Sequence, residues 1–499
     1  MATGDRKLKL NAFFLPYFAT SHLIPLVDTA RLFASRGVNV TIITTPANAV
    51  LFQHSIDHEN SSGGHRITVR TVKFPSAEVG VPEGIENFSA VTSMEMAGKV
   101  GQGIQLLQKL FEQMIREAHP DCIVSDMMYP WTADVAREMG IPRLAVYATN
   151  CFYHSTSHSL KLFAPHDKVQ SETETFVIPG LPDKIEMTRA RLQDYAKTKT
   201  QFGELINLVK ESELRSYGII FTSFSELEPA YVDHYKNVMG RKCWHIGLAS
   251  HFLNRMKAGQ EEIRNSVNNT QKHSSLSWLD NHKPNTVLYV CFGSMIHFSG
   301  SQLAEMASAL EASGHPFVWV VRKSWNAEEQ EEDWLPEGFE ERMKEANKGL
   351  IIRDWAPQLL ILNHQATGGF MTHCGWNSSL EGITAGVPLI TWPLFAEQFF
   401  NEMLISRILK IGVEVGSDVW NAGFDIKSPV VGKDKIVKAI TCLMGSSKEG
   451  HEMRRRAEEI AAMVKSSVEE GGSSYSDLDA LIGEITACAS QKLERVASN

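Results

Sequence analysis

Cysteine is scarce in this chain, and its pattern argues against a disulfide-linked protein and against a cysteine-based metal site. The seven cysteines are odd in number, are scattered between Cys122 and Cys488, and form no C-x-x-C pair. Such a pattern is typical of reduced thiols in an intracellular protein and not of a disulfide framework. His373 and Cys374 have no further ligand at metal-binding spacing, so no metal site is predicted there. We therefore expect a cytoplasmic protein without a bound metal.

Long hydrophobic runs and long basic runs are missing as well. No segment is long and apolar enough to cross a bilayer. The apolar run Leu8–Leu15 predicts a buried strand and not a signal peptide, because Asn11 and Pro16 interrupt a short run that leads into a helix start. The formal net charge of −9 argues against a nucleic-acid partner. We expect no nucleic acid, no integral membrane segment and a monomeric protein.

Three familiar phosphate- or metal-binding patterns are absent or misplaced. The chain has no G-x-x-x-x-G-K-[ST]. Gly101-x-Gly103 begins like a dinucleotide fingerprint, but Leu106 occupies the third small position, inside a predicted helix. Asp477-x-Asp479 has the spacing of a metal-binding pair, but it lies in a late polar helix where we expect a solvated face. These observations weaken the NAD, ATP and metal interpretations together.

What the sequence does contain is a repeated alternation of strands and helices. With 499 residues, of which 43% are hydrophobic and 21% charged, the chain is long enough for two or more globular domains. Short β-rich runs alternate with helical patterns, which predicts parallel, doubly wound sheets. In the first half the predicted strands are Leu8–Leu15, Val38–Thr45, Ile67–Phe74, Cys122–Ser125, Leu144–Tyr147 and Gly218–Ser223, and the predicted helices include His22–Arg36, Glu95–Ala118 and Trp131–Met139.

The alternation restarts after a polar stretch, which predicts a second domain of the same class. Residues 251–282, rich in Asn, Gln, Ser, Lys and Glu, are the predicted linker between domains at 1–250 and 283–470. Residues 471–499 predict a C-terminal helix that packs back on the N-terminal domain. Residues 164–199 are polar and poorly periodic, which predicts a long loop region of the kind that often carries specificity. The predicted fold is α/β, with two facing Rossmann-like domains and an active-site cleft between them.

One segment, from Trp355 to Gln398, is much richer in polar side chains than its surroundings. It reads WAPQLLILNHQATGGFMTHCGWNSSLEGITAGVPLITWPLFAEQ. Its residue types offer a flat face for a base, donors for a diphosphate and acceptors for sugar hydroxyls. A helix that starts after the predicted strand Gly369–Met371 would add free backbone N–H groups for the phosphates. The segment therefore predicts a nucleotide-sugar site.

The W-x-P-Q, H-C-G-W-N-S and terminal Glu-Gln elements of this segment resemble the signature box of plant family-1 UDP-dependent glycosyltransferases. The resemblance spans the whole box, and a weaker one extends from Leu8 to the GGSSY motif at residues 471–475. It implies an inverting enzyme with the two-domain GT-B fold. It also implies an acceptor-binding N-terminal domain, a UDP-sugar-binding C-terminal domain, UDP-glucose as co-substrate and no cofactor or metal.

The resemblance assigns donor-binding roles to single residues. Uracil would stack on Trp355 and meet the backbone of Ala356, and the ribose would bind to Gln358 and Glu381. The diphosphate would bind to His373, Gly375, Asn377, Ser378 and, from a neighbouring loop, Ser294. The sugar would bind to Trp376, Glu397 and Gln398. A Gln at the last position is frequent in glucose users, whereas Glu397 stands where Asp is commoner.

Transfer also requires a base for the acceptor hydroxyl, and His22 matches the family's catalytic histidine. It follows the first predicted strand at the carboxyl edge of the N-terminal sheet, where a helix start would disfavour imidazolium and keep His22 neutral. Asp126, at the end of strand Cys122–Ser125, matches the aspartate that orients the base. Asp121 and Asp134 are rivals, but the first begins that strand at the opposite edge and the second lies in the following helix.

The acceptor pocket is the least defined part of the site. Aromatic and methionine side chains near the same sheet edge suit a large apolar ligand, although core packing explains them equally well. These residues are Phe18, Met127, Met128, Tyr129 and Phe152.

The acceptor itself is indicated only by resemblance. The segment Phe18–Asp28, together with Phe395-Ala396-Glu397, resembles a plant subgroup that includes enzymes acting on triterpenoid sapogenins, with flavonoid enzymes close by. We expect a sapogenin acceptor. A flavonoid or phenolic acceptor, UDP-galactose or UDP-glucuronate as donor, and a non-catalytic nucleotide-sugar-binding protein are the alternatives.

Overall fold

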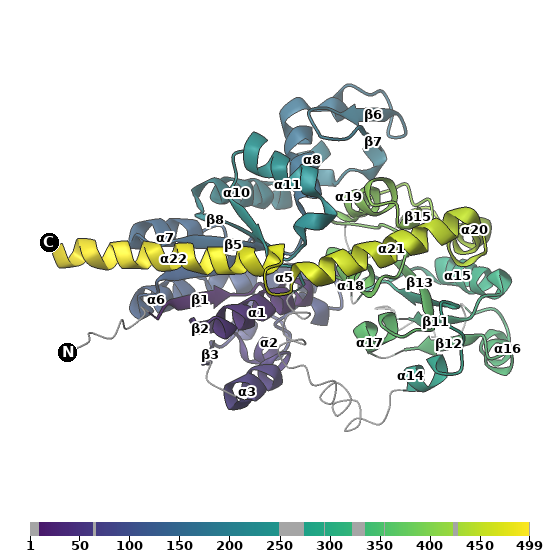
Figure 1. Cartoon of the computed structure of the whole chain (residues 1–499), viewed down its shortest axis with the longest axis horizontal. Helices are drawn as coiled ribbons and strands as arrows, with labels where there is room; N and C mark the ends of the chain where they lie inside the picture. Colours follow the sequence, from purple (N-terminus) through teal and green to yellow (C-terminus); the bar gives the residue numbers. More distant parts are fainter. Residues whose placement is uncertain are drawn as a thin grey trace.

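Two parallel β-sheets, each accompanied by helices, form the frame of the protein (Figure 1). The structure is a computed structural model that describes residues 9–62, 66–248, 274–293, 295–321, 335–353, 355–422 and 428–498. The first sheet has seven strands in the order β3-β2-β1-β4-β5-β8-β9, and the second has six in the order β12-β11-β10-β13-β14-β15. The predicted α/β class with two parallel sheets is therefore confirmed. We call residues 9–248 the N-half and residues 274–467 the C-half.

The N-half is built on short apolar strands, and β4 and β5 are buried along their whole length, as central parallel strands are. Its strands are β1 (Asn11–Leu15), β2 (Asn39–Thr44), β3 (Ile67–Thr71), β4 (Cys122–Asp126), β5 (Arg143–Tyr147), β8 (Gly218–Phe221) and β9 (Cys243–His245). Its helices are α1 (Thr20–Ser35), α2 (Pro46–Val50), α3 (Gln53–Ser62), α4 (Ser76–Val79), α5 (Met94–Leu106), α6 (Gln108–Ala118), α7 (Thr132–Met139), α8 (Cys151–Phe163), α9 (Asp194–Lys197), α10 (Gln201–Arg215) and α11 (Pro229–Asp233).

The C-half repeats this plan with a second core of its own. Its strands are β10 (Val287–Cys291), β11 (Phe317–Val320), β12 (Gly349–Ile352), β13 (Thr367–Thr372), β14 (Leu389–Thr391) and β15 (Gly412–Glu414). Its helices are α14 (Ser274–Leu279), α15 (Gly300–Ser313), α16 (Phe339–Glu345), α17 (Gln358–Leu362), α18 (Trp376–Ala385), α19 (Gln398–Met403), α20 (Lys433–Met444) and α21 (Lys448–Ser467).

The strand order of each sheet brings two particular loops together. In the first sheet β1 pairs with β4, and Leu15 lies beside Ser125. In the second sheet β10 pairs with β13, and Cys291 lies beside Thr372. The order of strands reverses at both places, and ligands of open α/β sheets bind at such points, beyond the carboxyl ends of the strands.

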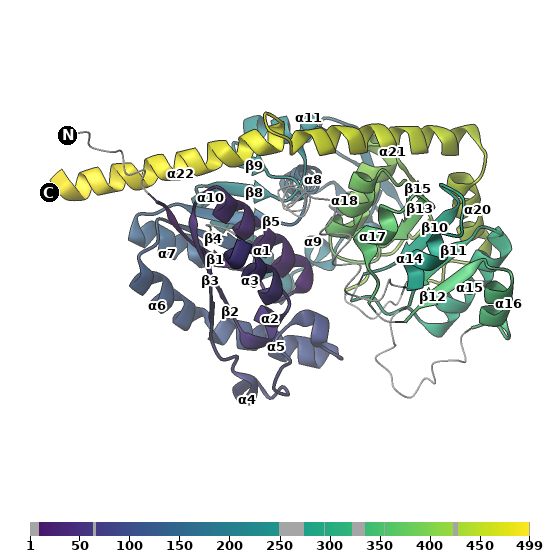
Figure 2. The ribbon, with the colours of Figure 1, turned by 60° about the horizontal axis from the view of Figure 1, so that its bottom comes forward.

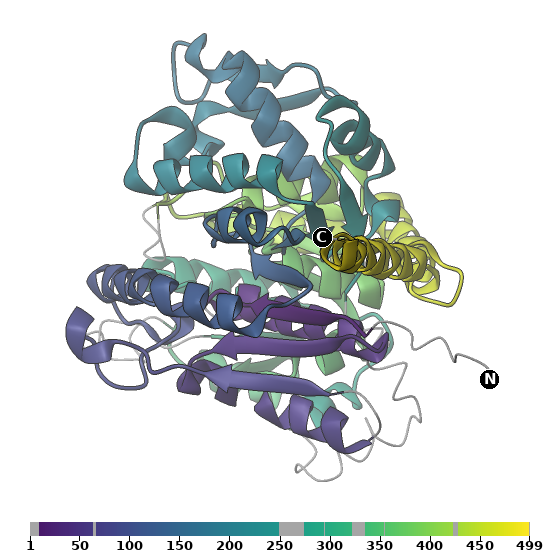
Figure 3. The same cartoon turned by 90° about the vertical axis from the view of Figure 1, so that its left-hand side faces the viewer.

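Two segments differ from the elements that the sequence predicted. Residues 164–199 contain an antiparallel hairpin of β6 (Thr175–Ile178) and β7 (Ile185–Thr188), which lies at the top of Figure 3. Phe176 and Ile178 alternate with exposed neighbours, a strand signal that the polar context had hidden. The predicted helix Glu95–Ala118 is two helices, α5 and α6, that meet at Leu107.

The last two helices extend along both halves of the molecule (Figure 2). The helix α21 packs on α18 and α20, and α22 (Ser473–Ser498) runs beside β9. The backbone N–H of His245 donates to Asp477 at 2.8 Å, and Arg36 Nε donates to Asp479 at 2.8 Å. The expected solvated face holds for Asp479, whose side chain is 47% exposed, but not for Asp477, which is partly buried against β9. None of the helices in the described ranges has the length and apolar character needed to cross a bilayer.

Candidate active site

A histidine and an aspartate meet at the carboxyl edge of the first sheet. His22 lies in the first turn of α1, and Asp126 is the last residue of β4. The His22 Nδ1 and Asp126 Oδ2 atoms are 2.9 Å apart. The side chain of Asp126 is 2% exposed and that of His22 is 28% exposed, so the imidazole is the part of the pair that reaches the surface. With Nδ1 directed at the carboxylate, Nε2 is the nitrogen left to accept a proton from a ligand.

Further contacts hold Asp126 in place. Its second carboxylate oxygen, Oδ1, accepts the backbone N–H of Met128 at 2.9 Å. Its backbone carbonyl lies 3.4 Å from the guanidinium of Arg143, a buried residue that begins β5. Burial lowers the pKa of Arg143 to about 10, and the nearby Asp126 is among the acidic groups that oppose this shift. The side chain and the backbone of Asp126 are thus both anchored.

The charge environment of His22 differs from the one that its helix position predicts. Burial lowers its pKa, but the charge and hydrogen bond of Asp126, together with the charge of Glu397, outweigh burial and raise the pKa above its ordinary value. The lowering of this pKa that the helix start would cause is thus not the net effect, because the carboxylates of Asp126 and Glu397 raise the pKa instead. A histidine with a raised pKa is a stronger base. Its neutral form, however, becomes the main form only at a higher pH.

The two rival aspartates are engaged elsewhere. Asp121 accepts the backbone N–H of Asn11 at 2.8 Å, before β4 begins. Asp134 lies in α7 and pairs with Arg137 at 2.9 Å. Among the three aspartates considered, Asp126 is the one that the structure joins to His22.

In the C-half, a tight turn between β13 and α18 gathers several of the predicted donor-binding residues. Cys374 in this turn has a φ of +65°. A Cβ atom at Gly375 would lie 2.4 Å from Nε2 of His373, so the turn requires a glycine for the imidazole to fit. Gly375 caps α18 without a side-chain hydrogen bond, and the first N–H groups of the helix are directed at this turn. Burial lowers the pKa of His373 to about 4, so the ring is a neutral donor near pH 7.

The first residues of α18 also reach the N-half. The Asn377 Nδ2 atom donates to the backbone carbonyl of Ser21 at 2.7 Å, one residue before His22. Two buried polar atoms at the same helix start, Trp376 Nε1 and Asn377 Oδ1, have no hydrogen-bond partner in the part of the chain that the structure describes. Buried polar groups are normally paired, so these atoms suit contact with a polar ligand.

The residues predicted to bind a nucleoside come from the segment between β12 and α17, from the start of α17 and from the second turn of α18. The side chain of Trp355 is 70% exposed, which leaves its flat face accessible. Gln358 Nε2 donates to Glu381 Oε2 at 2.6 Å and to Ser378 Oγ at 3.3 Å. Burial raises the pKa of Glu381 to about 7, with the hydrogen bond from Gln358 opposing the shift. These groups form a connected set of donors and acceptors beside the turn at Gly375.

Glu397 and Gln398, predicted to bind the sugar, stand at the start of α19. The Oε1 atom of Gln398 accepts the backbone N–H groups of Leu394 and Phe395 at 2.9 and 3.0 Å. This use of the oxygen leaves the amide NH₂ as the ligand-binding end of Gln398. Asn401 donates to Glu397 at 3.3 Å, and the charges of Glu397 and His22 influence each other, so the two groups lie close across the halves.

The remaining predictions have mixed outcomes. Phe18 and Phe152 are 0% exposed, and core packing, the alternative explanation, describes them as the structure has them. Tyr129 is also buried, whereas Met127 and Met128 are partly exposed beside Asp126. Their positions in the sequence, all close to the same sheet edge, could not show which of these side chains are buried in the core and which are partly exposed. Ala356 is buried beside Trp355, and Ser294 lies outside the described residues.

Two aromatic residues that the sequence did not single out are Tyr17, which lies beside His22, and Phe88, which stacks on Tyr17. The ring of Tyr17 is 5.9 Å from that of His22 and 5.7 Å from that of Phe88, with which it stacks at 22°. Both aromatic side chains are partly exposed. The position of Tyr17 between β1 and His22 was an available signal, but nothing in the sequence links Phe88 to this place.

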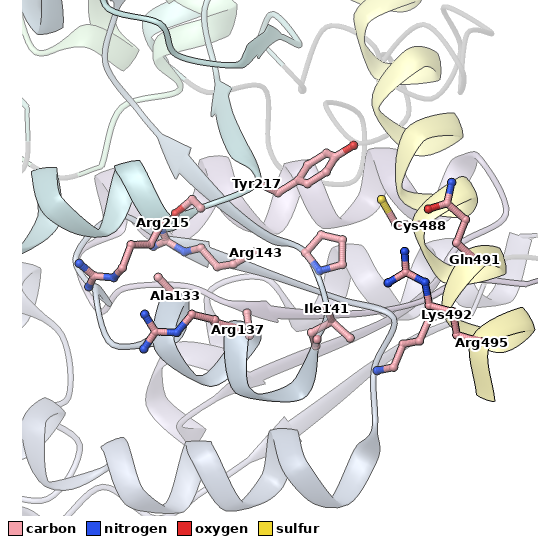
Figure 4. A pocket seen from close by; sticks show the side chains of 14 residues that line it. Ala133, Arg137, Ile141, Arg143, Arg215, Tyr217, Cys488, Gln491, Lys492 and Arg495 are labelled. Carbon is pink, nitrogen blue, oxygen red and sulfur yellow. Dashed lines mark hydrogen bonds between the residues drawn. The ribbon is translucent and has the colours of Figure 1, made fainter. Parts of the chain in front are cut away.

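A pocket of about 400 Å³ lies elsewhere, at the opposite edge of the first sheet (Figure 4). Residues just before or at the start of β5 and β8 line it together with α22. Arg137 and Arg215 lie on one side of it, and Lys492 and Arg495 lie on the other (Figure 4). Because His22 and Asp126 lie at the carboxyl edge, this pocket is separate from the candidate active site.

Comparison with known proteins agrees with this geometry. The family model for UDP-glucoronosyl and UDP-glucosyl transferase matches residues 18–416. The nuatigenin 3-beta-glucosyltransferase of Solanum aculeatissimum is 50% identical over 96% of this chain and 97% of its own. The UDP-glucose flavonoid 3-O-glucosyltransferase 7 of Fragaria ananassa is 46% identical over 96% of this chain and 97% of its own.

The crystal structure of Glycyrrhiza uralensis UGT73P12, complexed with glycyrrhetinic acid 3-O-monoglucuronide, superposes with a TM-score of 0.91. It is 44% identical in sequence and covers 98% of each chain. The two parallel sheets thus have the GT-B arrangement that the signature box implied. Sequence, structure and site agree, and the chain belongs to the UDP-glucoronosyl and UDP-glucosyl transferase family, as a plant-type UDP-glycosyltransferase.

Proposed function

We propose that the protein is an inverting UDP-glucosyltransferase that transfers glucose to a hydroxyl or carboxyl group of an apolar plant metabolite, a triterpenoid sapogenin in particular. The observation that carries this proposal is the position of His22. Its imidazole is paired with Asp126 at 2.9 Å, and the preceding residue, Ser21, accepts a hydrogen bond from Asn377 at 2.7 Å. A proton acceptor therefore stands next to the start of the helix predicted to bind the diphosphate.

In the proposed reaction, His22 Nε2 takes the proton of the acceptor group as its oxygen attacks the anomeric carbon of glucose. The new C–O bond forms while the bond to UDP breaks, and the electron pair leaves with the diphosphate. Attack from the side opposite to UDP inverts the anomeric configuration. Asp126 stabilises the imidazolium that forms, and the N–H groups of α18 with the neutral His373 stabilise charge on the departing UDP.

The chain's own residues supply these functions, and we propose that no metal ion takes part. Backbone N–H groups and neutral side-chain donors at the turn between β13 and α18 would take the place that a divalent ion holds in other transferases. Treatment with EDTA should leave the transfer rate unchanged, within about twofold, after the enzyme has been desalted. A strict requirement for added Mn²⁺ or Mg²⁺ would contradict this part of the proposal.

The donor assignment depends on two residues at the start of α19. Gln398 presents its amide NH₂ because its oxygen is held by the backbone, and Glu397 offers carboxylate oxygens to sugar hydroxyls. The family resemblance at Gln398 favours UDP-glucose over UDP-galactose, and UDP-glucuronate, with its extra carboxylate, would lie close to the negative charge of Glu397. Glucose is therefore the donor we propose.

The acceptor assignment is supported by the relatives and by the surroundings of His22. One relative is named for nuatigenin, and a superposed structure holds a glycyrrhetinic acid derivative, both large and apolar. Another relative is named for flavonoids, which are smaller and flatter. The partly exposed Tyr17, Phe88, Met127 and Met128 near the catalytic pair offer apolar contact to either class.

One experiment tests the whole proposal. Purified protein is incubated with UDP-glucose, UDP-galactose or UDP-glucuronate and a panel of sapogenins and flavonoids, and products are read by mass spectrometry. We expect a hexose adduct on a sapogenin with UDP-glucose at the highest rate. If no acceptor in the panel leads to release of UDP, the result would instead favour a nucleotide-sugar-binding protein without turnover. Faster conversion of flavonoids would overturn the acceptor class and leave the reaction type intact.

A further inference from the structure

A short segment of the N-half is docked on the loop that carries Glu397 and Gln398. This segment, residues 189–193, follows strand β7, and Figure 1 shows the β6–β7 hairpin above α19 and β15. The backbone carbonyl of Ala190 accepts the N–H of Trp420 at 2.9 Å. The guanidinium of Arg407 donates to the carbonyl of Glu186 at 3.1 Å, just before the segment. One backbone and one side-chain hydrogen bond thus join the two halves at this place.

Arg191 anchors the segment by charge. Its Nη2 lies 2.7 Å from Asp418, and its Nη1 lies 3.6 Å from Glu414 and 3.7 Å from Glu402. The Glu402 side chain is 0% exposed, and burial raises the pKa of its carboxyl group well above the ordinary value, against which the charge of Arg191 acts from the N-half. Such an arrangement fixes the position of residues 189–193 more firmly than surface ion pairs would.

The best-placed contact of the segment is made by Gln193. This side chain is 2% exposed, and its Nε2 donates to the backbone carbonyl of Ala396 at 3.1 Å. The same carbonyl accepts the indole N–H of Trp420 at 3.0 Å. Two side-chain donors, one from each half, therefore converge on a single carbonyl oxygen.

Ala396 has a backbone conformation that needs such support. Its φ is +51°, in the left-handed region that residues with a Cβ atom rarely adopt. A strained residue of this kind persists only where its surroundings hold it, and here two hydrogen bonds do so. The direction of the next two side chains, Glu397 and Gln398, follows from this backbone turn.

A further contact ties Gln193 to the N-half wall of the same site. Gln193 also lies beside the hydroxyl of Tyr153, whose pKa it lowers against the larger effect of burial, and this hydroxyl is 3.1 Å from that of Tyr195. The charge of Glu397 raises the pKa of both tyrosines, after the larger effect of burial, so their hydroxyls lie close to that carboxylate. Gln193 thus stands between the tyrosines of one half and the strained turn of the other.

We propose that Gln193 is a positioning residue for the donor sugar: it fixes the Ala396 turn, and thereby the aim of Glu397 and Gln398, from the opposite half of the molecule. This inference rests on the proposed role of Glu397 and Gln398 in sugar binding. If so, donor-sugar selectivity is not determined by the signature segment Trp355–Gln398 alone. It depends also on residues 189–193, in a region that the sequence marked as a loop.

The test compares ligands with and without the sugar. Affinities of UDP and UDP-glucose are measured by calorimetry for the wild type, Gln193→Ala and Gln193→Glu. Glu is close to Gln in size but donates no hydrogen bond in its ionised form, so it separates the hydrogen bond from packing. We expect both variants to bind UDP as the wild type does and to lose about fivefold in UDP-glucose affinity, the effect of one ordinary hydrogen bond.

Two further variants complete the design. Trp420→Phe keeps an aromatic ring but removes the second donor to Ala396, and we expect a loss in the same direction. Gln201→Ala, at the exposed start of α10, is the matched control and should change nothing. In transfer assays, the positioning variants should raise KM for UDP-glucose and bring the rates with UDP-glucose and UDP-galactose closer together.

The outcomes separate this inference from the proposed function. Equal losses of UDP and UDP-glucose affinity would indicate a general loss of structure and would overturn the positioning role. Unchanged affinities and an unchanged glucose preference in Gln193→Glu would overturn it as well. If the wild type transfers no sugar to any acceptor, the proposed function fails, yet the difference between UDP and UDP-glucose binding still decides the role of Gln193.

Discussion

The two sides of the active site differ in how far the chain completes them by itself. On the N-half side, His22 and Asp126 already form a pair at 2.9 Å, and the second carboxylate oxygen is bonded to Met128. On the C-half side, Trp376 Nε1 and Asn377 Oδ1 are buried without a partner in the described ranges. The base is thus preorganised. On the donor side Gln358 and Glu381 are bonded to each other, but two buried polar atoms remain that suit pairing with a ligand. Loss of the base should therefore affect the rate, and loss of donor groups should affect binding.

The largest effect is expected from removal of the base. His22→Ala should lower kcat by about a thousandfold, within the range of general base catalysis, while UDP-glucose affinity stays close to that of the wild type. Single-turnover rates and calorimetry measure the two quantities. His54→Ala, an exposed histidine on α3, serves as the control. Near-full transfer by His22→Ala would show that another group takes the proton.

The next effect concerns the partner of the base and has a distinctive pH signature. Asp126→Asn should lower kcat by about a hundredfold. The pKa of His22 is raised mainly through Asp126, against the lowering by burial, so removing that charge lowers the pKa. Since the neutral imidazole is the active form, activity is lost as the pH falls through this pKa, and in Asp126→Asn the loss moves to lower pH. The pH dependence of kcat/KM reports the shift.

Asp134→Asn provides the comparison for this variant, since Asp134 was a rival in sequence and pairs with Arg137 in the structure. It should keep both the rate and the pH profile. The opposite ranking of the two variants would mean that the Asp126–His22 contact is structural only.

A smaller effect is expected on the donor side, from the exposed ring predicted to stack on uracil. Trp355→Ala should weaken UDP binding about tenfold, the typical value of one aromatic–base stacking contact. Trp355→Phe, which keeps a smaller aromatic face, should lose less. Calorimetry with UDP alone isolates the effect from the sugar and from the acceptor. Equal affinity in all three proteins would remove Trp355 from the donor site.

The smallest effect is a pH dependence of donor binding that does not involve the base. Burial raises the pKa of Glu381 to about 7, and its ionised form is the double acceptor for ribose hydroxyls. The ionised form is lost as pH falls through this value, so UDP affinity should decrease severalfold from about pH 8 to about pH 6. Glu381→Gln should bind more weakly and show a flatter pH dependence. A decrease of the same size in Glu381→Gln would assign the titration to another group.

The same contrast explains how much could be predicted from the sequence. The signature segment is continuous, so its residue types and spacing indicated a donor site around the start of α18. His22 and Asp126 could be placed because each follows an apolar run that predicts a parallel strand, and the carboxyl ends of such strands share one edge. These predictions depend on local pattern and on one general rule of α/β sheets.

Features that depend on tertiary packing could not be predicted from the sequence. Phe18 and Met128 both lie near the correct edge, but only the structure shows that one is in the core and the other partly exposed. Gln193 sits in a polar stretch without periodicity, and its contact with Ala396 joins residues that are far apart in the chain. The pKa of His22 is raised mainly by Asp126, and a further, smaller contribution comes from Glu397, which the fold brings in from the other half.

The helices α21 and α22 have a mechanical consequence for any movement of the halves. The chain returns from the C-half to the N-half around Gly471, between α21, which packs on α18 and α20, and α22, which packs on β9. Asp477 and Asp479, in the first turns of α22, bind His245 and Arg36 of the N-half. Because each helix is fixed to its own half, a movement of one half against the other has to change the direction of the chain at the short turn between the two helices.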